Sequence, residues 1–500
     1  MFRKILVANR GEIAVRVMRT CKVMGIATVA VYSAADKAAL HVLEADEAVF
    51  IGESEPQASY LRIDRIIEAA RKTGAEAIHP GYGFLSERAP FAKACEDAGI
   101  VFIGPSSGVI EQLGDKLVAR ALMQSRGVPV TPGVLLEGTD PEEAKKAVAA
   151  VGYPVLIKAA AGGGGKGMRI VERPEDFDTA CKQAASEAMA AFGDSRVYVE
   201  KYIAQPRHIE FQILADKYGH AIHLLERECS IQRRYQKIIE ETPSPILDQA
   251  LRARMGEAAV QVVRATGYVN AGTVEFLLDG QTRDFYFLEV NTRLQVEHPV
   301  TEAVTGLDLV RLQIEIAAGQ PLTLQQQDIR AQGHAFECRI YAEDPAHGFA
   351  PSPGKIRQIH LPQGPGIRHD IGVYAEVEVP VYYDPILAKL IVHGPTREAA
   401  RERMIEALRQ YAVLGIQTPV AYLIDVMQHE AFGRGELSTH FLKDYFSNWQ
   451  PSQDHVDLAC IAYVLDEMFP VANNAASARS GGEGVPPSPW QTLGSWRMNE

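Results

Sequence analysis

The sequence has little cysteine and no long hydrophobic run. Its six cysteines are scattered along the chain without a Cys-x-x-Cys spacing, a pattern typical of reduced thiols in a cytoplasmic protein. No apolar stretch approaches the roughly 18 residues that a helix needs to cross a bilayer, so we expect no membrane partner. The short apolar start at residues 4–8 soon reaches a Gly-Glu pair, which predicts a first strand rather than a signal peptide.

The chain also lacks a surplus of positive charge, because its formal net charge is −12. Proteins that bind nucleic acid usually carry a basic surplus, so we expect no nucleic-acid partner. A chain of 500 residues that is 47% hydrophobic and 23% charged is instead typical of a soluble globular protein. For that length we expect about two to four domains.

The first 114 residues alternate between strand and helix patterns. Strands are expected at residues 4–8, 28–32, 77–79 and 101–103, with helices at 12–24, 60–72 and 90–98. Short strands separated by such helices predict a doubly wound parallel sheet, and hence an α/β domain over residues 1–114. Ligands bind beyond the carboxyl ends of such strands. The sequence HPGYG at residues 79–83 occupies one of these ends, although a plain glycine-rich turn is the alternative.

Two further regions and a tail follow. Residues 115–330 contain expected strands at 155–159, 168–171, 197–202, 209–215 and 222–226, and a pair between 272 and 290. Residues 331–446 contain expected strands at 335–341 and 387–393 and a helix at 397–412. Residues 447–500 form the tail, in which residues 472–489 have the Ala, Asn, Ser, Gly and Pro composition of a flexible linker.

A glycine-rich loop, GGGGKG at residues 162–167, stands between two expected strands of the second region. It matches a dinucleotide-binding fingerprint formally, but a strand rather than a helix follows it. It is not a Walker A loop either, because Gly167 stands where that motif needs Ser or Thr. With Lys158 and Lys166 beside it, we expect its N–H groups to close over phosphate oxygens. The alternative is a surface loop without a ligand.

A β-hairpin is expected at residues 272–291, because two alternating segments flank a turn at residues 279–284. Glu275 and Glu289 are equidistant from Thr282 at the centre of this turn. A symmetric hairpin places them opposite each other, with Cβ atoms about 5 Å apart. Like charges at that distance repel unless a divalent cation bridges them, and Mg²⁺ prefers carboxylates together with nucleotide phosphates. Two solvated glutamates are the alternative.

Polar residues continue to alternate beyond the hairpin. If the second strand stays extended, one face carries Glu289, Asn291, Arg293, Gln295 and Glu297. Arg293 can then hold a small oxyanion with two hydrogen bonds, and Glu297 can act as a base toward that anion. Three other basic residues stand singly in their segments and by themselves are typical of surface or structural positions: His208, Lys237 and Arg339.

Taken together, these segments resemble the biotin carboxylase family, in particular the biotin carboxylase part of acyl-CoA carboxylase α chains. The resemblance runs from Ile5 to about residue 446. Its motifs are ANRGEIA at 8–14, HPGYGFLSE at 79–87, GDK at 114–116, the glycine loop, ERECSIQRRYQK at 226–237 and EVNTRLQVEHPVTE at 289–302. One position departs from the family pattern, because Tyr235 stands where many relatives have His.

The resemblance implies a fold and a nucleotide site. A central ATP-grasp domain, with a mobile glycine-loop lid at about residues 131–204, lies between the N-terminal α/β domain and an α+β C-terminal domain. The implied ATP-binding residues are Lys116, Lys158, Gly163, Gly164, Gly165, Met168, Glu200, Lys201, Ile203, His208 and Gln232. Among them, the lysines at 116 and 158 contact phosphates, the residues at 200, 201 and 203 line the adenine pocket, and the histidine lies near the ribose.

For the chemistry, the resemblance implies three groups of residues. Glu275, Glu289 and Asn291 hold Mg²⁺ or Mn²⁺. Lys237, Arg293, Gln295 and Val296 bind bicarbonate. Glu297 deprotonates the bicarbonate, and Arg339 stabilises the biotin enolate. The implied activity is ATP- and bicarbonate-dependent carboxylation of biotin on a carrier through carboxyphosphate, the first half-reaction of a biotin-dependent, acyl-CoA-type carboxylase.

The resemblance also implies partners, namely a biotin carboxyl carrier protein or domain, a second copy of the biotin carboxylase part in a homodimer, and a carboxyltransferase subunit. Relatives attach biotin to the lysine of an Ala-Met-Lys-Met motif. This chain contains no Met-Lys-Met, so we expect the biotinylated lysine elsewhere. The segment 488–499, with Trp490 and Trp496, is expected to order only against a partner or a further domain.

Two alternative functions stay open. Another ATP-grasp ligase, which joins a carboxylate to an amine, shares the metal pair and the glycine loop but does not need Arg293, Glu297 and Arg339. A non-catalytic nucleotide-binding regulator is disfavoured because Glu297 is present. The final acceptor also stays open, since acetyl-CoA, propionyl-CoA, methylcrotonyl-CoA and pyruvate systems share this half-reaction.

Overall fold

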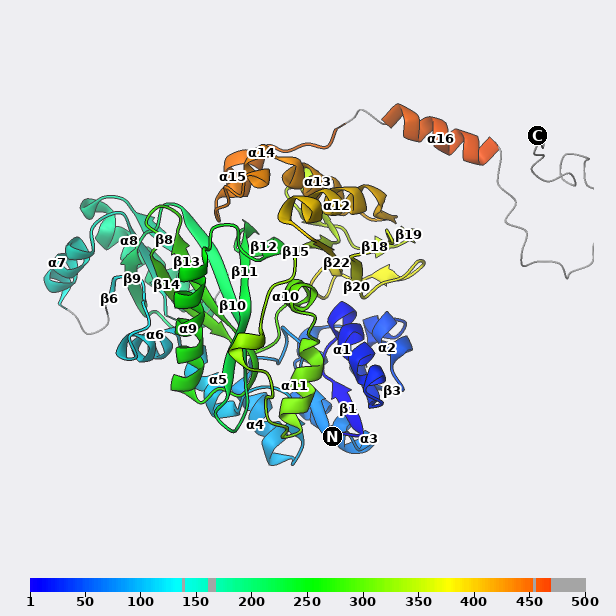
Figure 1. Ribbon diagram of the computed structural model, residues 1–500, viewed down its shortest axis with the longest axis horizontal. Coiled ribbons are helices and arrows are strands. Elements are labelled where there is room, and N and C mark those ends of the chain that lie inside the picture. Colours follow the sequence, from blue (N-terminus) through cyan, green and yellow to red (C-terminus); the bar gives the residue numbers. More distant parts are fainter. Residues whose placement is uncertain (137–139, 161–167, 453–455, 469–500) are drawn as a thin grey trace, which may run out of the picture. The chain divides into compact units, whose positions relative to one another are not determined.

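The computed structural model describes residues 1–136, 140–160, 168–452 and 456–468 (Figure 1). The chain divides into two compact units, Met1–Gln450 and Pro451–Glu500. Three expected features fall outside the described residues: the glycine loop with Gly163, Gly164 and Gly165, the linker at 472–489, and the segment with Trp490 and Trp496. None of the described helices combines the length and the hydropathy that a membrane span requires.

A five-stranded parallel sheet forms the N-terminal part of the first unit, in the order β3-β2-β1-β4-β5. Its strands are β1 (Lys4–Val7), β2 (Ala27–Ser33), β3 (Glu47–Gly52), β4 (Ala77–His79) and β5 (Val101–Phe102). Its helices are α1 (Gly11–Val23), α2 (Leu40–Glu44), α3 (Ile63–Thr73), α4 (Ala89–Asp97) and α5 (Ser107–Gly114). The predicted α/β class and parallel sheet are confirmed, and β3 and α2 are additions to the predicted elements.

The loops after β1 and β4 meet at the carboxyl edge of this sheet. β1 is a short apolar run that is buried throughout its last three residues, as in parallel strands that are covered on both faces. Beyond it, the Asn9 side chain donates hydrogen bonds to the carbonyl oxygens of Pro80 and Tyr82. Gly81 has a φ of +62°, and a Cβ there would meet the Asn9 side chain. The ANRGEIA and HPGYGFLSE motifs are therefore packed together.

A four-stranded antiparallel sheet, in the order β6-β9-β7-β8, follows α6 (Lys116–Ser125). Its strands are β6 (Gly133–Leu135), β7 (Val155–Ala159), β8 (Arg169–Val171) and β9 (Val197–Lys201), and its helices are α7 (Pro141–Val151) and α8 (Phe177–Phe192). Val155, Ile157 and Val199 belong to an apolar core of its own. These elements occupy the range in which the lid is expected, and the exact lid boundaries stay a prediction.

An eight-stranded antiparallel sheet forms the rest of the framework, in the order β14-β13-β10-β11-β12-β15-β22-β20. Its strands are β10 (Pro206–Ala215), β11 (Ala221–Arg233), β12 (Gln236–Thr242), β13 (Asn270–Asp279), β14 (Phe285–Asn291), β15 (His334–Tyr341), β20 (Ile367–Ile371) and β22 (Ile386–Gly394). β12 pairs with β15, so one continuous sheet crosses the expected domain boundary at residue 330.

Helices cover this sheet, and α9 lies along its β10 and β11 strands (Figure 1). The helices are α9 (Gln249–Thr266), α10 (His298–Thr305), α11 (Leu309–Ala317), α12 (Arg397–Gln410), α13 (Val420–Gln428), α14 (Glu430–Gly433) and α15 (Phe441–Phe446). Short strand pairs are β16 (Glu343–Asp344) with β17 (Ala350–Pro351), β18 (Gly354–Lys355) with β21 (Glu378–Val379), and β19 (Gln358–His360) with β23 (Ala412–Leu414). In the second unit, the described helix is α16 (Val456–Met468).

Candidate active site

A cavity of about 850 Å³ lies between the four-stranded sheet, the eight-stranded sheet and the loop that follows β14. Each predicted site residue that the structure describes lines this cavity: Lys116, Lys158, Met168, Glu200, Lys201, Ile203, His208, Gln232, Lys237, Glu275, Glu289, Asn291, Arg293, Gln295, Val296, Glu297 and Arg339. Residues chosen from separate segments of the sequence therefore meet in one place.

The hairpin of β13 and β14 has the predicted register, with Glu275 directly opposite Glu289. The two carboxylates have different surroundings. Glu275 is buried and accepts a hydrogen bond from Lys237 Nζ at 2.9 Å. Glu289 is half-buried and forms an ion pair with Lys116 at 2.9 Å. A bulge follows Glu275 in the ladder, so the symmetric pairing that the turn predicts holds at this position and shifts beyond it.

These residues supply a donor set that fits Mg²⁺ or Mn²⁺. The two carboxylates and the amide oxygen of Asn291 are hard oxygen donors on neighbouring strand positions. Asn291 Oδ1 accepts from Arg293 Nη2 at 3.0 Å, and its buried Nδ2 has no partner within the described part of the chain. Each carboxylate is neutralised by a lysine here, so a bound cation would compete with Lys116 and Lys237 for the same oxygens.

The segment after β14 is a loop. The strand ends at Asn291, and Leu294 turns into the apolar core, where its side chain is 1% exposed. α10 then begins at His298, with a proline in its first turn. The prediction of one extended face through Glu297 is therefore wrong, because burial of the leucine and the start of the helix break the strand. The loop nevertheless keeps its polar side chains at the cavity.

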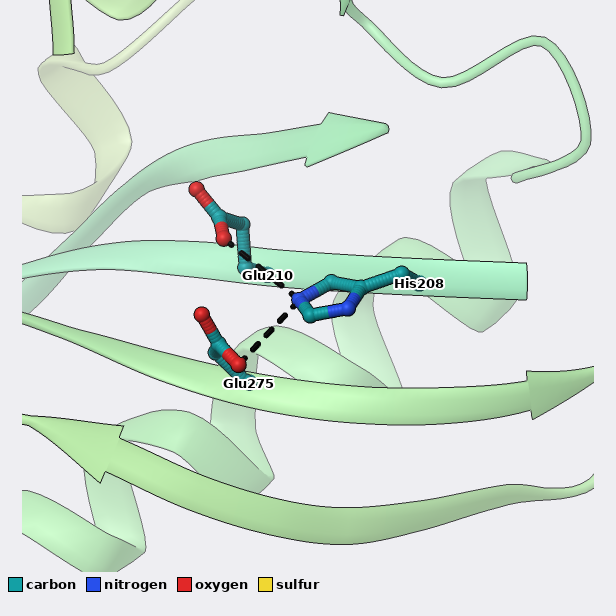
Figure 2. Close-up of side chains that lie close together, drawn as sticks. All are labelled: His208, Glu210 and Glu275. Atoms are coloured by element: carbon teal, nitrogen blue, oxygen red, sulfur yellow. Dashed lines mark ion pairs between the residues drawn. The ribbon is translucent and has the colours of Figure 1, made fainter. Parts of the chain in front are cut away.

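Glu275 also belongs to a tight group with His208 and Glu210, which Figure 2 shows converging from β10 and β13. His208 Nε2 lies 3.2 Å from a Glu275 oxygen and 3.7 Å from a Glu210 oxygen. Burial opposes a charge on the imidazole, but the attraction of Glu275 outweighs it and raises the pKa of His208 to about 9. The imidazole is therefore positively charged at neutral pH, which suits contact with a hydroxyl or phosphate oxygen.

Lys237 lies at the centre of a carboxylate cluster. Its ammonium group donates to Glu210 at 2.5 Å, to Glu275 at 2.9 Å and to Glu297 at 2.6 Å. Burial lowers the pKa of Lys237, but the three carboxylates raise it well above its ordinary value. The lysine therefore keeps its positive charge and can attract a small anion into the cavity.

Glu297 stands between two cations. Its Oε1 accepts from Lys237, and its Oε2 accepts from Arg339 Nη2 at 2.9 Å. The side chain is 2% exposed, and such burial opposes ionisation. The charges of Lys237 and Arg339 more than compensate and hold the pKa of Glu297 below its usual range. Glu297 is thus an ionised carboxylate, as a general base must be.

Arg293 and Arg339 are fixed by carboxylates that the sequence analysis did not identify. Arg293 Nε donates to Glu87 at 2.8 Å, and Arg339 Nε donates to Glu240 at 2.6 Å. Glu87 is the last residue of the HPGYGFLSE motif, so this motif holds Arg293 of the EVNTRLQVEHPVTE motif in place. Glu240 has no such signal, because β12 reads QKIIEET with two adjacent glutamates, and its partner lies 99 residues away.

On the opposite wall, charged groups of the four-stranded sheet face the cavity. Glu200 of β9 accepts from Lys158 of β7 at 2.6 Å and from Arg120 at 2.7 Å. Lys201 donates to the carbonyl oxygen of Gly152 at 2.8 Å. Burial lowers the pKa of Lys116, but Glu289 outweighs it and raises the pKa. Lys116 is therefore held as a cation, and a phosphate group could replace the carboxylate partners of Lys116 and Lys158.

Three family models match successive parts of the chain. The model described as "Biotin carboxylase, N-terminal domain" matches residues 1–110. "Carbamoyl-phosphate synthase L chain, ATP binding domain" matches residues 115–325. "Biotin carboxylase C-terminal domain" matches residues 337–444. The second match contains the four-stranded sheet and the strands β10 to β14 of the eight-stranded sheet, and the third match begins within β15 of that same sheet.

Curated relatives are similar over nearly the same length. A pyruvate carboxylase subunit of Methanothermobacter thermautotrophicus is 56% identical over 89% of this chain and 90% of its own. Biotin carboxylase 2 of Bacillus subtilis is 53% identical over 89% of this chain and 100% of its own. The propionyl-CoA carboxylase alpha chain of Ruegeria pomeroyi is 50% identical over 89% of this chain and 68% of its own.

Solved structures have the same fold. The biotin carboxylase domain dimer of Hydrogenobacter thermophilus 2-oxoglutarate carboxylase, in complex with MgADP, ADP and bicarbonate, superimposes with a TM-score of 0.86. It is 48% identical and covers 91% of this chain and 100% of its own. Biotin carboxylase of Campylobacter jejuni, in a complex with a β,γ-ATP compound, gives a TM-score of 0.85 at 46% identity over 89% of this chain and 99% of its own.

Proposed function

The chain belongs to the biotin carboxylase family, and on this premise we propose how its cavity carboxylates biotin with ATP and bicarbonate. The reaction is the first half-reaction of a biotin-dependent carboxylase. The observation that carries the residue assignments is the position of Glu297 between Lys237 and Arg339. The buried base Glu297 thus contacts Lys237, which is proposed to bind bicarbonate, and Arg339, which is proposed to stabilise the biotin enolate.

ATP occupies the side of the cavity next to the four-stranded sheet in this proposal. Lys116 and Lys158 exchange their carboxylate partners for phosphate oxygens, and Met168 and Ile203 line the base together with Glu200 and Lys201 of β9. His208, held by Gln232 at 3.0 Å, contacts the ribose. The phosphate contacts that the sequence predicts for Gly163, Gly164 and Gly165 lie outside the described residues. Glu275, Glu289 and Asn291 hold Mg²⁺ or Mn²⁺, which when bound neutralises charge on the transferring phosphoryl group.

Bicarbonate binds beside the loop after β14. Lys237 and Arg293 supply positive charge, and Gln295 and the backbone of Val296 complete its hydrogen bonds. Glu297 takes the bicarbonate proton, and the resulting oxygen nucleophile attacks the γ-phosphorus of ATP. The bond from that phosphorus to the β-phosphate oxygen breaks, so that ADP leaves and carboxyphosphate forms.

Carboxyphosphate then breaks down to CO₂ and phosphate inside the closed cavity, where water is excluded. The phosphate takes the N–H proton of the biotin ureido ring, and the ring nitrogen forms a bond to the carbon of CO₂. Negative charge develops on the ureido oxygen before that bond is complete. Arg339 holds this charge, because its guanidinium group lies beside Glu297 on the wall of the cavity.

The carrier, the carboxyltransferase and the second copy of the chain are proposed as partners. Supporting the dimer is the name of the Hydrogenobacter relative, which describes a biotin carboxylase domain dimer. Supporting a separate carrier is the absence of Met-Lys-Met from the sequence, and intact mass spectrometry of the purified chain should detect no covalent biotin. A cytoplasmic location is proposed from the free cysteines, of which Cys21, Cys95, Cys229 and Cys338 are buried.

The decisive assay follows ADP release by the full chain with bicarbonate present, with and without free biotin. We expect biotin to stimulate ADP release and to become carboxylated in proportion. ADP release that needs an amine and ignores biotin would instead identify a carboxylate–amine ligase. Nucleotide binding without any ADP release would identify a non-catalytic regulator.

A further inference from the structure

Two fully buried carboxylates lie side by side behind Arg339. Glu240 of β12 and Glu337 of β15 are cross-strand partners, and they are 1% and 0% exposed. Such partners project from the same face of a sheet with Cβ atoms about 5 Å apart. Within the described residues, Glu240 Oε2 and both Glu337 oxygens are buried without a hydrogen-bond partner. Two ionised carboxylates this close, with their oxygens unsolvated, repel each other strongly.

The pair has charged neighbours on several elements. Arg339 of β15 and Lys389 of β22 act as cations, Glu297 of the loop before α10 acts as an anion, and Lys237 of β12 adds another cation. The α10 helix, which packs against β12, β15 and β22, contributes the buried imidazole of His298 and the carboxylate of Glu302. The Cys338 thiol, next in sequence to Glu337, points into the core on the α12 side of the sheet.

These surroundings do not allow both carboxylates to ionise at neutral pH. Burial raises the pKa of Glu240 to about 7, although Arg339 opposes this effect. Burial also raises the pKa of Glu337 well above its ordinary value, with Lys389 in opposition. Since each charge also disfavours the other, the pair binds one proton between two sites and has a net charge close to −1.

This proton affects the charge available at Arg339. The guanidinium group donates to Glu240 through Nε and to Glu297 through Nη2, and Nη2 also forms an ion pair with Glu240. If Glu240 and Glu297 were both ionised, the single positive charge of Arg339 would face two negative charges. The negative charge that develops on biotin would then be repelled. Glu297 loses its charge when it accepts the bicarbonate proton. A proton shared between Glu240 and Glu337 would reduce the negative charge of Glu240 as well.

We propose that Glu240 and Glu337 share one proton and act together as a positioning pair, holding Arg339 in place while leaving its positive charge free for the anion on biotin. This inference rests on the function proposed above. Neither carboxylate touches a substrate. Glu240 provides the hydrogen-bond acceptor that orients the guanidinium, and Glu337 keeps that acceptor from being fully negative.

The test compares Glu240→Gln and Glu337→Gln in the full chain with free biotin. The pH dependence of kcat is measured for biotin carboxylation and for bicarbonate-dependent ATP cleavage without biotin. In the wild type, biotin carboxylation should fall on the alkaline side as the pair loses its proton. Without Glu337, Glu240 ionises alone against Arg339, so this alkaline limb should move to lower pH by about one unit. In Glu240→Gln the neutral amide still accepts from Arg339 and cannot ionise, so the alkaline limb should be lost.

The matched control is Glu241→Gln. Glu241 is the next residue of β12, equally buried, and it binds Arg397 and His334 rather than Arg339. Its substitution should leave the alkaline limb in place. ATP cleavage without biotin should respond less than biotin carboxylation in the first two variants, because Arg339 acts on the biotin step. A limb that moves to lower pH in Glu337→Gln and is lost in Glu240→Gln supports the shared proton, and an unchanged limb in either variant overturns it.

Infrared difference titration gives a readout that does not depend on activity. The wild type should contain a protonated carboxyl band that titrates near neutral or alkaline pH, and in both single variants the band should titrate at lower pH, because the neighbouring charge is gone. A wild type without such a band overturns the inference even if Glu337→Gln does not fold. If biotin is not carboxylated at all but the band titrates as expected, then the proposed function fails while the shared proton stands.

Discussion

The two walls of the cavity differ in how firmly their charged groups are held. On the eight-stranded sheet, fully buried Arg227 donates to Glu210, Gln212 and Thr273, and to Thr301 at the start of α10. The four-stranded sheet is small and has its own apolar core, and its charged groups at the cavity form a smaller set, in which Glu200 contacts Lys158 and Arg120. The difference indicates that the proposed acid–base groups are more firmly preorganised than those of the wall proposed to bind the nucleotide.

The largest expected effect is on stability. Arg227→Met removes the cation that neutralises buried Glu210, so the free energy of unfolding should fall by about 3–5 kcal/mol. Arg120→Met on the opposite wall is the matched variant, because Arg120 also pairs with a glutamate but its side chain is 15% exposed. Its loss should be clearly smaller. Urea unfolding of both variants measures this, and equal losses would contradict the contrast between the walls.

The next effect is on turnover. Glu297→Gln keeps the shape of the side chain but removes the base, so biotin carboxylation should slow by about 10²-fold or more. ATP binding should be nearly retained, because the nucleotide contacts proposed here lie toward the other wall. Steady-state kinetics and nucleotide calorimetry measure the two quantities. Carboxylation at the normal rate would show that Glu297 is not the base.

A smaller effect should separate the two chemical steps. Arg339→Ala should reduce biotin carboxylation about tenfold more than ATP cleavage without biotin, since oxyanion-type contacts act on one charge only. ATP cleavage should also slow somewhat, because Glu297 loses one of its two cations. Parallel measurement of both rates tests this. Equal loss of the two activities would count against an enolate role.

The smallest effect concerns the metal. Glu275→Gln and Glu289→Gln should each raise the Mg²⁺ concentration needed for half-maximal ATP cleavage, by a few-fold, because each removes an anionic ligand. The increase should be greater for Glu275, which also holds Lys237 and His208, than for half-buried Glu289. Mg²⁺ titrations compare them. Unchanged titrations in both variants would refute the metal assignment.

Local patterns predicted the parts of the site that depend on local geometry. The symmetric turn at residues 279–284 predicted Glu275 opposite Glu289, and the two are paired, although a bulge after Glu275 separates this pair from a register that is shifted by one residue next to the turn. Alternation failed after Asn291, where burial of Leu294 outweighs the polar pattern. The alternation nevertheless grouped Arg293, Gln295 and Glu297 correctly at the cavity. Roles for Lys237 and Arg339 came only through resemblance to a family, since no local pattern reports a fold-dependent contact.

Contacts between distant strands were the part that the sequence did not reveal. Arg339 meets Glu240 across 99 residues, and Lys389 donates to the carbonyl oxygen of Val296 across 93. Such pairings depend on the strand order β12-β15-β22, which no periodicity encodes. The buried acidic residues of these strands therefore went unidentified in the sequence, because their cationic partners lie on distant segments.

The pairing of β12 with β15 has a consequence for how this protein could be divided. Cutting the chain near residue 330 would leave each fragment with an unpaired strand that carries half of the biotin-binding chemistry. Bare strand edges of this kind associate with any available strand, so each fragment alone should aggregate. When the two fragments are expressed together, they should associate through the pairing of β12 with β15. A gene recombination event near residue 330 would therefore separate β12 from β15, and the active-site residues on these two strands function only when the strands are paired.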